Sequence, residues 1–459
     1  MFKHTLTLAL LAGLAATSPA QADEESLRQE VAALRAEMTA LKAQVAQMQG
    51  NAQVAQSAQT SQTAAAPANP YAPSAPPRSA GVAANGNALA SNAEAAKPGS
   101  GIPVNDTTRL WGYGELNYNH PTGRSSDTQA DVRRAVLGFS HAFDEDTHVY
   151  GELEWEHAVV SADDAGESEV EQLYVEHQLS AAVTIRAGLT LIPLGFLNEH
   201  HEPTNYYGVE RNFVETAIIP STWREGGISA LGSTDFGLSW NVGVSTSQDI
   251  NKWDPTDPES RASPLGAIHQ ELQLAKAHDP AFYAAANYQG IVGLTVGGGF
   301  FTSKIGQGQT TSLAQDSRLT IGEVHARWQP GPFDLSALYS RGRITDTKDI
   351  NLTFLGNPYP IPKSFWGGYV QGAWRVWESG DSSLSPFVRY ESFNTASSFE
   401  TQPLGLGVPN GKTENVWTVG MNYYLTPAVV FKADYQHFNI TDDVLGYGNR
   451  FDLGVGYQF

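Results

Sequence analysis

The chain has 459 residues, with 44 Gly, 25 Pro, 47 aromatic residues and a formal net charge of −20. It contains no cysteine, which excludes a disulfide scaffold, a thiolate metal site, a cysteine nucleophile and a lipid anchor on an N-terminal cysteine. The acidic balance argues against a nucleic-acid partner, because binding DNA requires a dense basic face. The sequence contains no apolar run of about 18 residues, the length that would predict a transmembrane helix. A transmembrane β-barrel needs no such run.

Residues 1–22 have the three regions of a secretory signal peptide. A weakly basic start precedes an apolar stretch from Thr5 to Thr17, and the small-x-small sequence Ala20-Gln21-Ala22 follows. We therefore expect these residues to be removed during export.

Residues 23–50 carry a heptad repeat. The apolar positions recur at alternating spacings of four and three, at Leu27, Val31, Leu34, Met38, Leu41, Val45 and Met48. This spacing predicts a helix with one apolar stripe, for which a second copy of the same segment is the natural partner in a coiled coil. The alternative is a lone amphipathic helix that packs on its own domain.

Residues 51–104 are rich in Ala, Gln, Ser and Asn, with five prolines between Pro67 and Pro77. Few large apolar side chains are present to bury, so this composition predicts a flexible linker. It would separate the N-terminal helix from the rest of the chain.

Residues 105–459 consist of short segments in which apolar and polar residues alternate. In the last one, Phe451, Leu453, Val455 and Tyr457 alternate with Asp452, Gly454, Gly456 and Gln458. We predict about sixteen such strands of roughly ten residues, near 109–118, 131–142, 147–157, 169–179, 183–189, 224–231, 236–246, 281–289, 292–302, 318–328, 333–342, 365–376, 385–393, 415–425, 428–437 and 449–459.

Short and long connections between these segments alternate along the chain. Phe143–Asp146 and Thr426–Pro427 are among the short ones, whereas 190–223 and 247–280 are among the long ones. Outer-membrane barrels have this arrangement, with short periplasmic turns and long extracellular loops. The terminal Phe459 resembles the assembly signal of such barrels. We predict an all-β fold, a transmembrane antiparallel β-barrel of about sixteen strands, surrounded by the lipid of a bacterial outer membrane.

The loop 190–223 mixes charged, aromatic and apolar residues, unlike an ordinary solvated loop. Its apolar side chains need burial, and the lumen of the barrel is the nearest place, so we expect the loop to fold inward and narrow the channel. The predicted constriction residues are Glu199, His200, His201, Glu202, Glu210, Arg211, Arg224 and Glu225. The run Glu199-His200-His201-Glu202 also suggests a zinc site, but no further spaced ligands accompany it, so we expect no metal and no cofactor.

Two stretches of this loop resemble the phosphate-selective porin O/P family. They are Tyr206-Tyr207-Gly208-Val209-Glu210-Arg211-Asn212 and Glu215-Thr216-Ala217-Ile218-Ile219-Pro220-Ser221-Thr222-Trp223-Arg224-Glu225-Gly226-Gly227. The resemblance implies a sixteen-stranded homotrimeric porin, and in some members an arginine-lined, lysine-gated pore for phosphate or polyphosphate. The loop itself departs from that pattern, since no lysine lies between Lys97 and Lys252.

Basic residues on the strands could contact a passing anion or pair with carboxylates of the wall. The charges expected to face the lumen are Arg134, Glu152, Glu154, Arg186, Arg341, Arg389 and Lys432. A ladder of free arginines would favour anions, whereas structural salt bridges would not. The sequence leaves both interpretations open.

We predict an outer-membrane porin, a passive channel for small hydrophilic solutes or ions, with inorganic anions such as phosphate suggested by the resemblance. Because no Gly-x-Ser-x-Gly elbow occurs, we do not expect an enzyme. The alternative is a structural tether, in which the helix at 23–50 contacts the cell wall and the barrel serves mainly as an anchor.

Overall fold

The computed structural model describes residues 101–459, except for residues 162, 355, 401–410 and 440–447. The predicted signal peptide and coiled-coil helix (1–22 and 23–50) lie outside the described residues, as does the predicted linker up to residue 100. Where the described part begins, β1 (Ile102–Pro103) pairs with β2.

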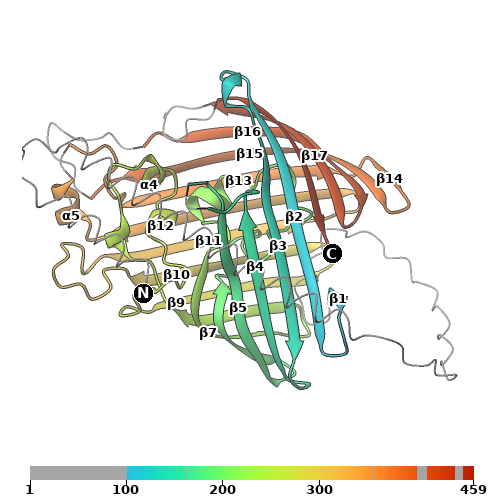
Figure 1. Ribbon diagram of the computed structural model, residues 1–459, viewed down its shortest axis with the longest axis horizontal. Helices are drawn as coiled ribbons and strands as arrows, with labels where there is room; N and C mark the ends of the chain where they lie inside the picture. The colour runs from blue at the N-terminus through green and yellow to red at the C-terminus, as the bar shows by residue number, and fades with distance from the viewer. Residues whose placement is uncertain (1–100, 162, 355, 401–410, 440–447) are drawn as a thin grey trace, which may run out of the picture. The chain divides into compact units, whose positions relative to one another are not determined.

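Sixteen long strands form the wall of a barrel in the described part of the chain (Figure 1). The first eight are β2 (Thr108–Pro121), β3 (Gln129–Ala142), β4 (Thr147–Glu156), β5 (Glu167–Ser180), β6 (Val183–Leu191), β7 (Arg224–Ser233), β8 (Leu238–Ser245) and β9 (Ala281–Ile291). The second eight are β10 (Leu294–Lys304), β11 (Arg318–Trp328), β12 (Phe333–Thr345), β13 (Ser364–Trp374), β15 (Ser382–Ser398), β16 (Glu414–Thr426), β17 (Val429–Asn439) and β18 (Arg450–Gln458). The short β14 (Trp377–Ser379) continues β13 along β15.

The ring is closed by the last and first long strands. Each of the sixteen strands pairs antiparallel with its neighbours, and β18 pairs with β2, with Gly454 opposite Asn117. Closure leaves none of the sixteen described strands with an unpaired edge, which suits a membrane, where water is not available to satisfy backbone groups. The predicted antiparallel barrel of about sixteen strands is confirmed, including the alternation of short turns, such as 181–182 and 427–428, with long loops.

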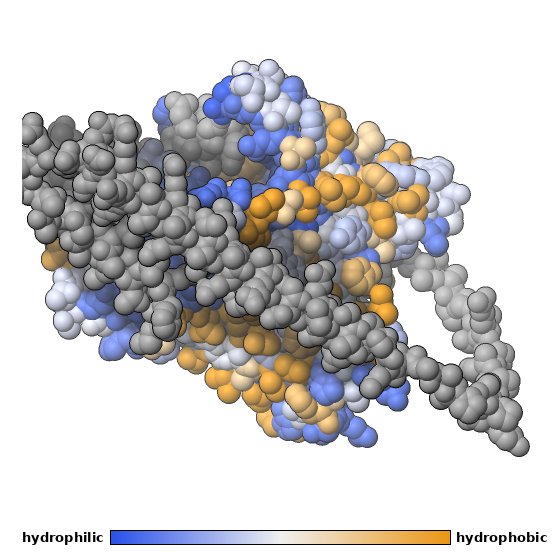
Figure 2. All heavy atoms as spheres, in the orientation of Figure 1, coloured by the Kyte–Doolittle hydropathy of each residue, from blue (hydrophilic) through white to orange (hydrophobic). Residues whose placement is uncertain are grey.

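The outward face of the wall is apolar because the strands alternate with a period of two. Val324, Val370, Trp417, Val419 and Phe431 are among the exposed large hydrophobic residues. Figure 2 shows hydrophobic side chains across the visible strands and hydrophilic ones towards both ends. This is the surface that a lipid bilayer would cover.

Short helices occur only in the loops of the described part. They are η2 (Ser125–Asp127), the π-helical η3 (Val214–Ile218), η4 (Ile250–Lys252), α4 (Pro258–Ala262), η5 (Gly266–Ile268) and α5 (Lys348–Thr353). None of these helices is long and apolar enough to cross a membrane.

One side of the barrel interior is filled by an apolar core. Inward residues of β10, β11 and β13, such as Phe301, Ile321 and Phe365, pack with Ile218 of the loop after β6 and Ile268 of the loop after β8. Alternation in a membrane barrel places apolar residues towards lipid and polar or glycine residues towards the lumen, but on this side apolar residues face the lumen as well. The reason is that the two long loops bring apolar surface into the lumen, and the inward face of these strands covers it.

Candidate pore constriction

The segment 192–223, between β6 and β7, folds into the barrel, and we call it the inner loop. Val209, Val214 and Ile218 are each at most 1% exposed. The loop predicted from the sequence spans 190–223, but its first two residues, Thr190 and Leu191, belong to β6. The inner loop crosses the lumen from β6 to the strands that close the ring.

Polar groups of the wall hold the tip of the inner loop. The hydroxyl of Tyr206 donates to Oε2 of Glu115 on β2 at 2.6 Å. The backbone N–H of Val209 donates to Asp434 on β17 at 2.7 Å, and that of Phe213 donates to Glu391 on β15 at 2.6 Å. Hydrogen bonds to carboxylates are strong when buried, so the loop is fixed at three places on the far wall.

Glycines of the wall make room for the loop at two close approaches. A Cβ added at Gly367 of β13 would lie 3.0 Å from Cγ1 of Ile218, and one at Gly456 of β18 would lie 2.4 Å from Cβ of Pro203. Larger side chains at these inward positions would push the loop away from the wall. These two glycines therefore allow the inner loop to pack closely against the wall.

A buried carboxylate connects the beginning of the inner loop to its helix. Glu215, which is 2% exposed, accepts hydrogen bonds from the N–H groups of Phe196 at 2.5 Å and Leu197 at 2.8 Å. It also accepts from the Nδ2 of Asn212 at 2.9 Å and from the hydroxyl of Tyr369 on β13 at 3.0 Å. Burial raises the pKa of Glu215 against the opposing effect of these bonds.

A buried ion pair joins the inner loop to β5. Nε2 of His201 lies 2.9 Å from Oε1 of Glu171, and Nδ1 of His201 lies 2.9 Å from the carbonyl oxygen of Asn198. Burial by itself lowers the pKa of His201, but the charge of Glu171 and the hydrogen bond to it outweigh this effect and raise the pKa to about 9. His201 is therefore a cation at neutral pH.

Two β-bulges place additional charged side chains in the lumen. On β5, Gln172 pairs with Glu152 and Val170 pairs with Leu153, so Glu171 between them is the extra residue, and it is fully buried. On β3, Arg134 pairs with Glu115 and Val132 with Leu116, so Arg133 is the extra residue. A bulge leaves its extra residue outside the alternation of the strand. Both bulged residues were missed by the sequence analysis, which relied on strict alternation.

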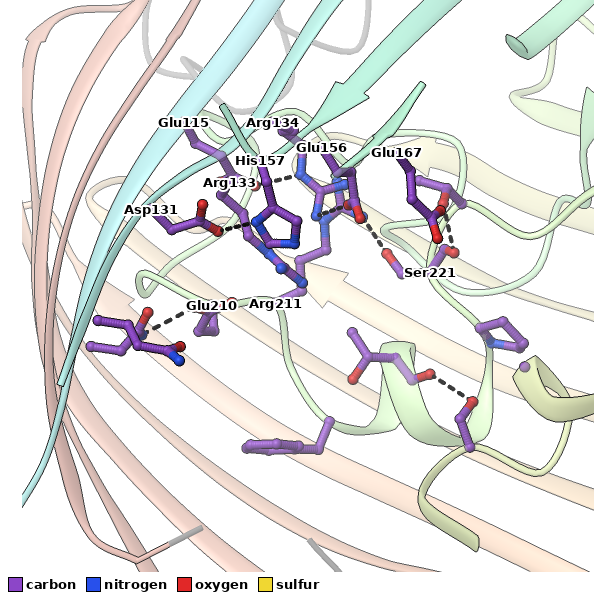
Figure 3. Close-up of a pocket in the computed structure, with 18 of the residues that line it drawn as sticks. Glu115, Asp131, Arg133, Arg134, Glu156, His157, Glu167, Glu210, Arg211 and Ser221 are labelled. Carbon is purple, nitrogen blue, oxygen red and sulfur yellow. Dashed lines mark hydrogen bonds and ion pairs between the residues drawn. The ribbon is translucent and has the colours of Figure 1, made fainter. Parts of the chain in front are cut away.

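A polar cavity of about 790 Å³ lies on the side of the lumen formed by β2–β5 (Figure 3). Six arginines line it: Arg124, Arg133, Arg134, Arg211, Arg224 and Arg450. Eight carboxylates line it as well: Glu115, Asp127, Asp131, Glu156, Glu167, Glu169, Glu210 and Glu271. The open space of the lumen is thus next to charged strands and opposite the apolar core.

Most of the arginines at the cavity have carboxylate partners. Nε of Arg134 lies 2.8 Å from Glu115, its NH1 lies 3.0 Å from Glu154, and its NH2 lies 3.3 Å from Glu156. Arg224 pairs with Glu169 and, at 3.2 Å, with Glu271 of the loop after β8. These guanidiniums are largely neutralised within the wall.

Two of the arginines at the cavity lack a carboxylate partner within 4 Å in the described part of the chain. Arg211 donates to Ser221 and, at 3.1 Å, to the carbonyl oxygen of His201. Arg133 makes no hydrogen bond or ion pair with the described residues. Both side chains extend into the cavity (Figure 3). They are the two cavity guanidiniums that no carboxylate of the described residues neutralises within 4 Å.

The structure brings only some of the predicted site residues together. Of the predicted constriction and lumen residues, those at the cavity are Arg134, Glu210, Arg211 and Arg224. Glu199 is not a lining residue of the cavity and lies 3.9 Å from Arg186, which also pairs with Glu176 at 2.8 Å.

The remaining predicted residues are distributed over the loop and the wall. His200 is exposed, Glu202 is buried beside Asn205 at 2.6 Å, and Glu225 accepts from Thr246 at 2.5 Å. Glu152, Glu154, Arg389 and Lys432 face inward and are buried. Arg389 pairs with Glu391 at 2.8 Å, and Nζ of Lys432 lies 3.5 Å above the ring of Tyr206.

Arg341 does not face the lumen. On β12 it shares a face with the exposed Leu335 and Tyr339, whereas Leu338 and Ser340 point inward and are buried. The prediction of a lumen-facing Arg341 is therefore corrected. The cause is that β12 has both polar and apolar residues on each face, so its sequence does not reveal which face is which.

The run Glu199-His200-His201-Glu202 does not converge on one point, since His200 is exposed and His201 pairs with Glu171. Within residues 101–459 and outside the gaps named above, no group of three or more His, Asp or Glu side chains is arranged to hold a metal ion.

The comparisons with known proteins agree with this geometry. Residues 302–444 match the family model of the phosphate-selective porins O and P. An uncharacterized protein of Aquifex aeolicus (strain VF5) is 29% identical over 367 residues, which cover 76% of this chain and 81% of that protein.

Among solved structures, Salmonella typhi OmpF in complex with daunomycin is similar at a TM-score of 0.53 and 17% identity, covering 77% of this chain and 97% of OmpF. An anion-selective porin from Comamonas acidovorans is similar at a TM-score of 0.47 and 12% identity, covering 77% and 99% of the two chains. The family match agrees with the resemblance found in the sequence, and the likeness to OmpF shows the same barrel fold.

Proposed function

We propose that this outer-membrane porin, whose residues 302–444 match the phosphate-selective porin O and P family, is a passive diffusion channel for small hydrophilic solutes with a modest preference for small anions. The observation that carries the preference is the pair Arg133 and Arg211, two guanidiniums at the polar cavity for which the described part of the chain provides no carboxylate partner. Solutes move down their gradient, and no bond is made or broken.

The inner loop and the apolar core support a narrowed path. The apolar core occupies the side of the lumen next to β10–β13, and the inner loop crosses the lumen and lines part of the polar cavity beside β2–β5. A charge close to a low-dielectric wall acts on a passing ion more strongly than the same charge in bulk water. The preference is modest because the cavity has eight carboxylates for six arginines, and Glu167, which makes no ion pair within the described residues, opposes Arg133 and Arg211.

The ion selectivity of charge-neutral variants tests this proposal. Arg133→Gln and Arg211→Gln should each lower the anion-to-cation permeability ratio, obtained from the reversal potential of the full chain in a planar bilayer under a KCl gradient. Arg375→Gln is the matched control, because Arg375 pairs with Glu378 at 3.2 Å and is not a cavity residue. Unchanged ratios in both cavity variants would refute the anion role of these residues.

Phosphate is the anion that we propose as cargo, on the basis of the family match. Added phosphate should reduce the chloride current of the unmodified protein and reduce it less in the Arg211→Gln variant. We also propose a homotrimer, as in the matched family, which chemical cross-linking of the protein in native membranes would detect.

The alternative, a cell-wall tether anchored by the barrel, differs in one measurable respect. A tether can be fully plugged, so well-inserted protein would give no conductance. The helix at 23–50 that would contact the wall lies outside the described residues.

A further inference from the structure

Three arginines lie together on the membrane-facing surface of the barrel. Arg341 and Arg343 of β12 share the outward face with Leu335 and Tyr339. Arg318 of β11 pairs with Thr345, and Arg343 pairs with Thr320, so all three lie on the same side of two neighbouring strands. We call Arg318, Arg341 and Arg343 the outer arginine patch.

These arginines have no partner within the described residues. All three side chains are exposed, and none makes a hydrogen bond or ion pair with the described part of the chain. A charge on the lipid face costs about 2–4 kcal/mol at the bilayer midplane and about 0–1 kcal/mol near the interface. Three such residues on one small area therefore indicate a position near the interface, or an anion that meets them there.

The height of the patch places it at the membrane boundary. Phe333 and Trp374 pair at the turn end of β12 and β13, where aromatic residues mark one interface. Arg341 is eight residues further along β12, which is about 20 Å along the barrel axis for a tilted strand, and the apolar band is about 25 Å tall. Arg341 thus lies just inside the upper edge of the band, and Arg343 and Arg318 lie at or above it, on the side of the long loops.

A groove beside the patch offers further recognition groups. It has a volume of about 420 Å³ and is lined by Arg341, Tyr339, Trp366, Ser364, Ser397 and Ser398. The rings of Tyr339 and Trp366 stack with their centroids 6.3 Å apart. A guanidinium suits phosphate, serine hydroxyls suit sugar hydroxyls, and aromatic rings pack on sugars and acyl chains.

We propose that the outer arginine patch and its groove bind the phosphate group of an outer-leaflet glycolipid, lipid A being the chemical type. Guanidinium groups bind phosphate through bidentate hydrogen bonds, and basic pockets at membrane interfaces bind anionic headgroups. The site is independent of the lumen and of the ion preference proposed above, since its residues face away from the cavity.

A second copy of the chain fits this surface less well. No aspartate or glutamate lies on the outward face of any of the sixteen long strands described here. Packing the patch on the wall of another barrel would bury three arginines without an opposite charge, which is costly. Charge complementarity therefore favours an anionic lipid.

The test uses the full chain, purified in detergent, and native mass spectrometry to count bound lipid. The probes are diphosphoryl lipid A and the same lipid with both phosphates removed. The triple variant R318Q/R341Q/R343Q should retain diphosphoryl lipid A about tenfold less than the unmodified protein. The dephosphorylated lipid should bind both proteins weakly and equally.

Two controls separate the loss of lipid binding from a general effect of charge removal or misfolding. Arg375→Gln removes one cation outside the groove, at the turn end of the wall, and should retain lipid A normally. Conductance in a planar bilayer should be unchanged in the triple variant, which also shows that it is folded; if it fails to assemble, R341Q and R343Q are measured separately.

Three results would overturn the proposal. Equal retention of lipid A by the variant and the unmodified protein would exclude the patch. Equal binding of the dephosphorylated lipid would exclude phosphate recognition. Displacement of lipid A by millimolar inorganic phosphate would show that the site takes free phosphate instead. A failure of the proposed channel function would appear as absent conductance of the unmodified protein in the bilayer control, whereas lipid retention is counted separately by mass spectrometry.

Discussion

The buried pair of His201 and Glu171 should hold the inner loop in place, and its removal should release the loop. His201 is 3% exposed and Glu171 is fully buried. Replacing His201 by Asn leaves the carboxylate of Glu171 without its cation, which in buried pairs costs about 3–5 kcal/mol. Glu171→Gln should cost less, and the double variant H201N/E171Q should recover part of the loss.

The pH dependence of loop stability gives a second value for the free energy that the pair of His201 and Glu171 contributes. The pKa of His201 is about 9 in the folded protein and about 6.5 for an unperturbed histidine, which corresponds to about 3 kcal/mol of stabilisation. Because the folded pKa is the higher one, the stabilisation is fully present below pH ~6.5 and is lost as the pH rises through about 9.

Hydrogen exchange measures this stabilisation within the loop. The amides of Leu197 and Val209 are protected by Glu215 and Asp434, so their exchange reports loop opening. Protection factors, corrected for the intrinsic exchange rate, should fall by at least about a hundredfold in H201N at neutral pH. In the unmodified protein they should fall by a similar factor between pH 6 and pH 10.

Two results would refute the reasoning. Protection in H201N equal to that of the unmodified protein would show that the pair does not hold the loop. Protection independent of pH over this range would show that His201 is not charged in the folded state.

Three further predictions concern the packing of the lumen. Gly456→Val should displace the inner loop, because a Cβ there would lie 2.4 Å from Cβ of Pro203, and single-channel recordings should show a larger conductance; unchanged conductance contradicts this. Tyr206→Phe removes the bond to Glu115 and should lower the opening free energy of the loop by about 1.5–3 kcal/mol in hydrogen exchange. Leu319→Ala in the apolar core should destabilise the barrel by about 2–5 kcal/mol in guanidinium unfolding, whereas Val324→Ala on the exposed outer face should cost far less.

The wall of the barrel could be predicted because membrane strands follow a strict period and the turns have strong signals. The segment 318–328 was predicted with the same bounds that β11 has, Arg318–Trp328. The inward folding of the loop after β6 could be predicted from its apolar residues, which had no other place to be buried.

The contents of the lumen could not be predicted from alternation. A bulge inserts one residue and shifts the alternation of the strand. The alternation of the sequence therefore does not predict that Arg133 and Glu171 face the lumen. On β11, Leu319 and Ile321 face inward and Val324 is displayed to lipid on the other face. The sequence contains apolar residues on both faces there, and only the packed loop decides between them.

The central claim is that this barrel conducts and that its cavity favours anions. The most direct measurement is the reversal potential of the purified full chain in a planar bilayer under a KCl gradient. The account predicts a steady conductance with a modest anion preference that Arg133→Gln and Arg211→Gln each reduce. A cation-selective current would contradict the role of these arginines, and well-inserted protein without any current would contradict the channel itself.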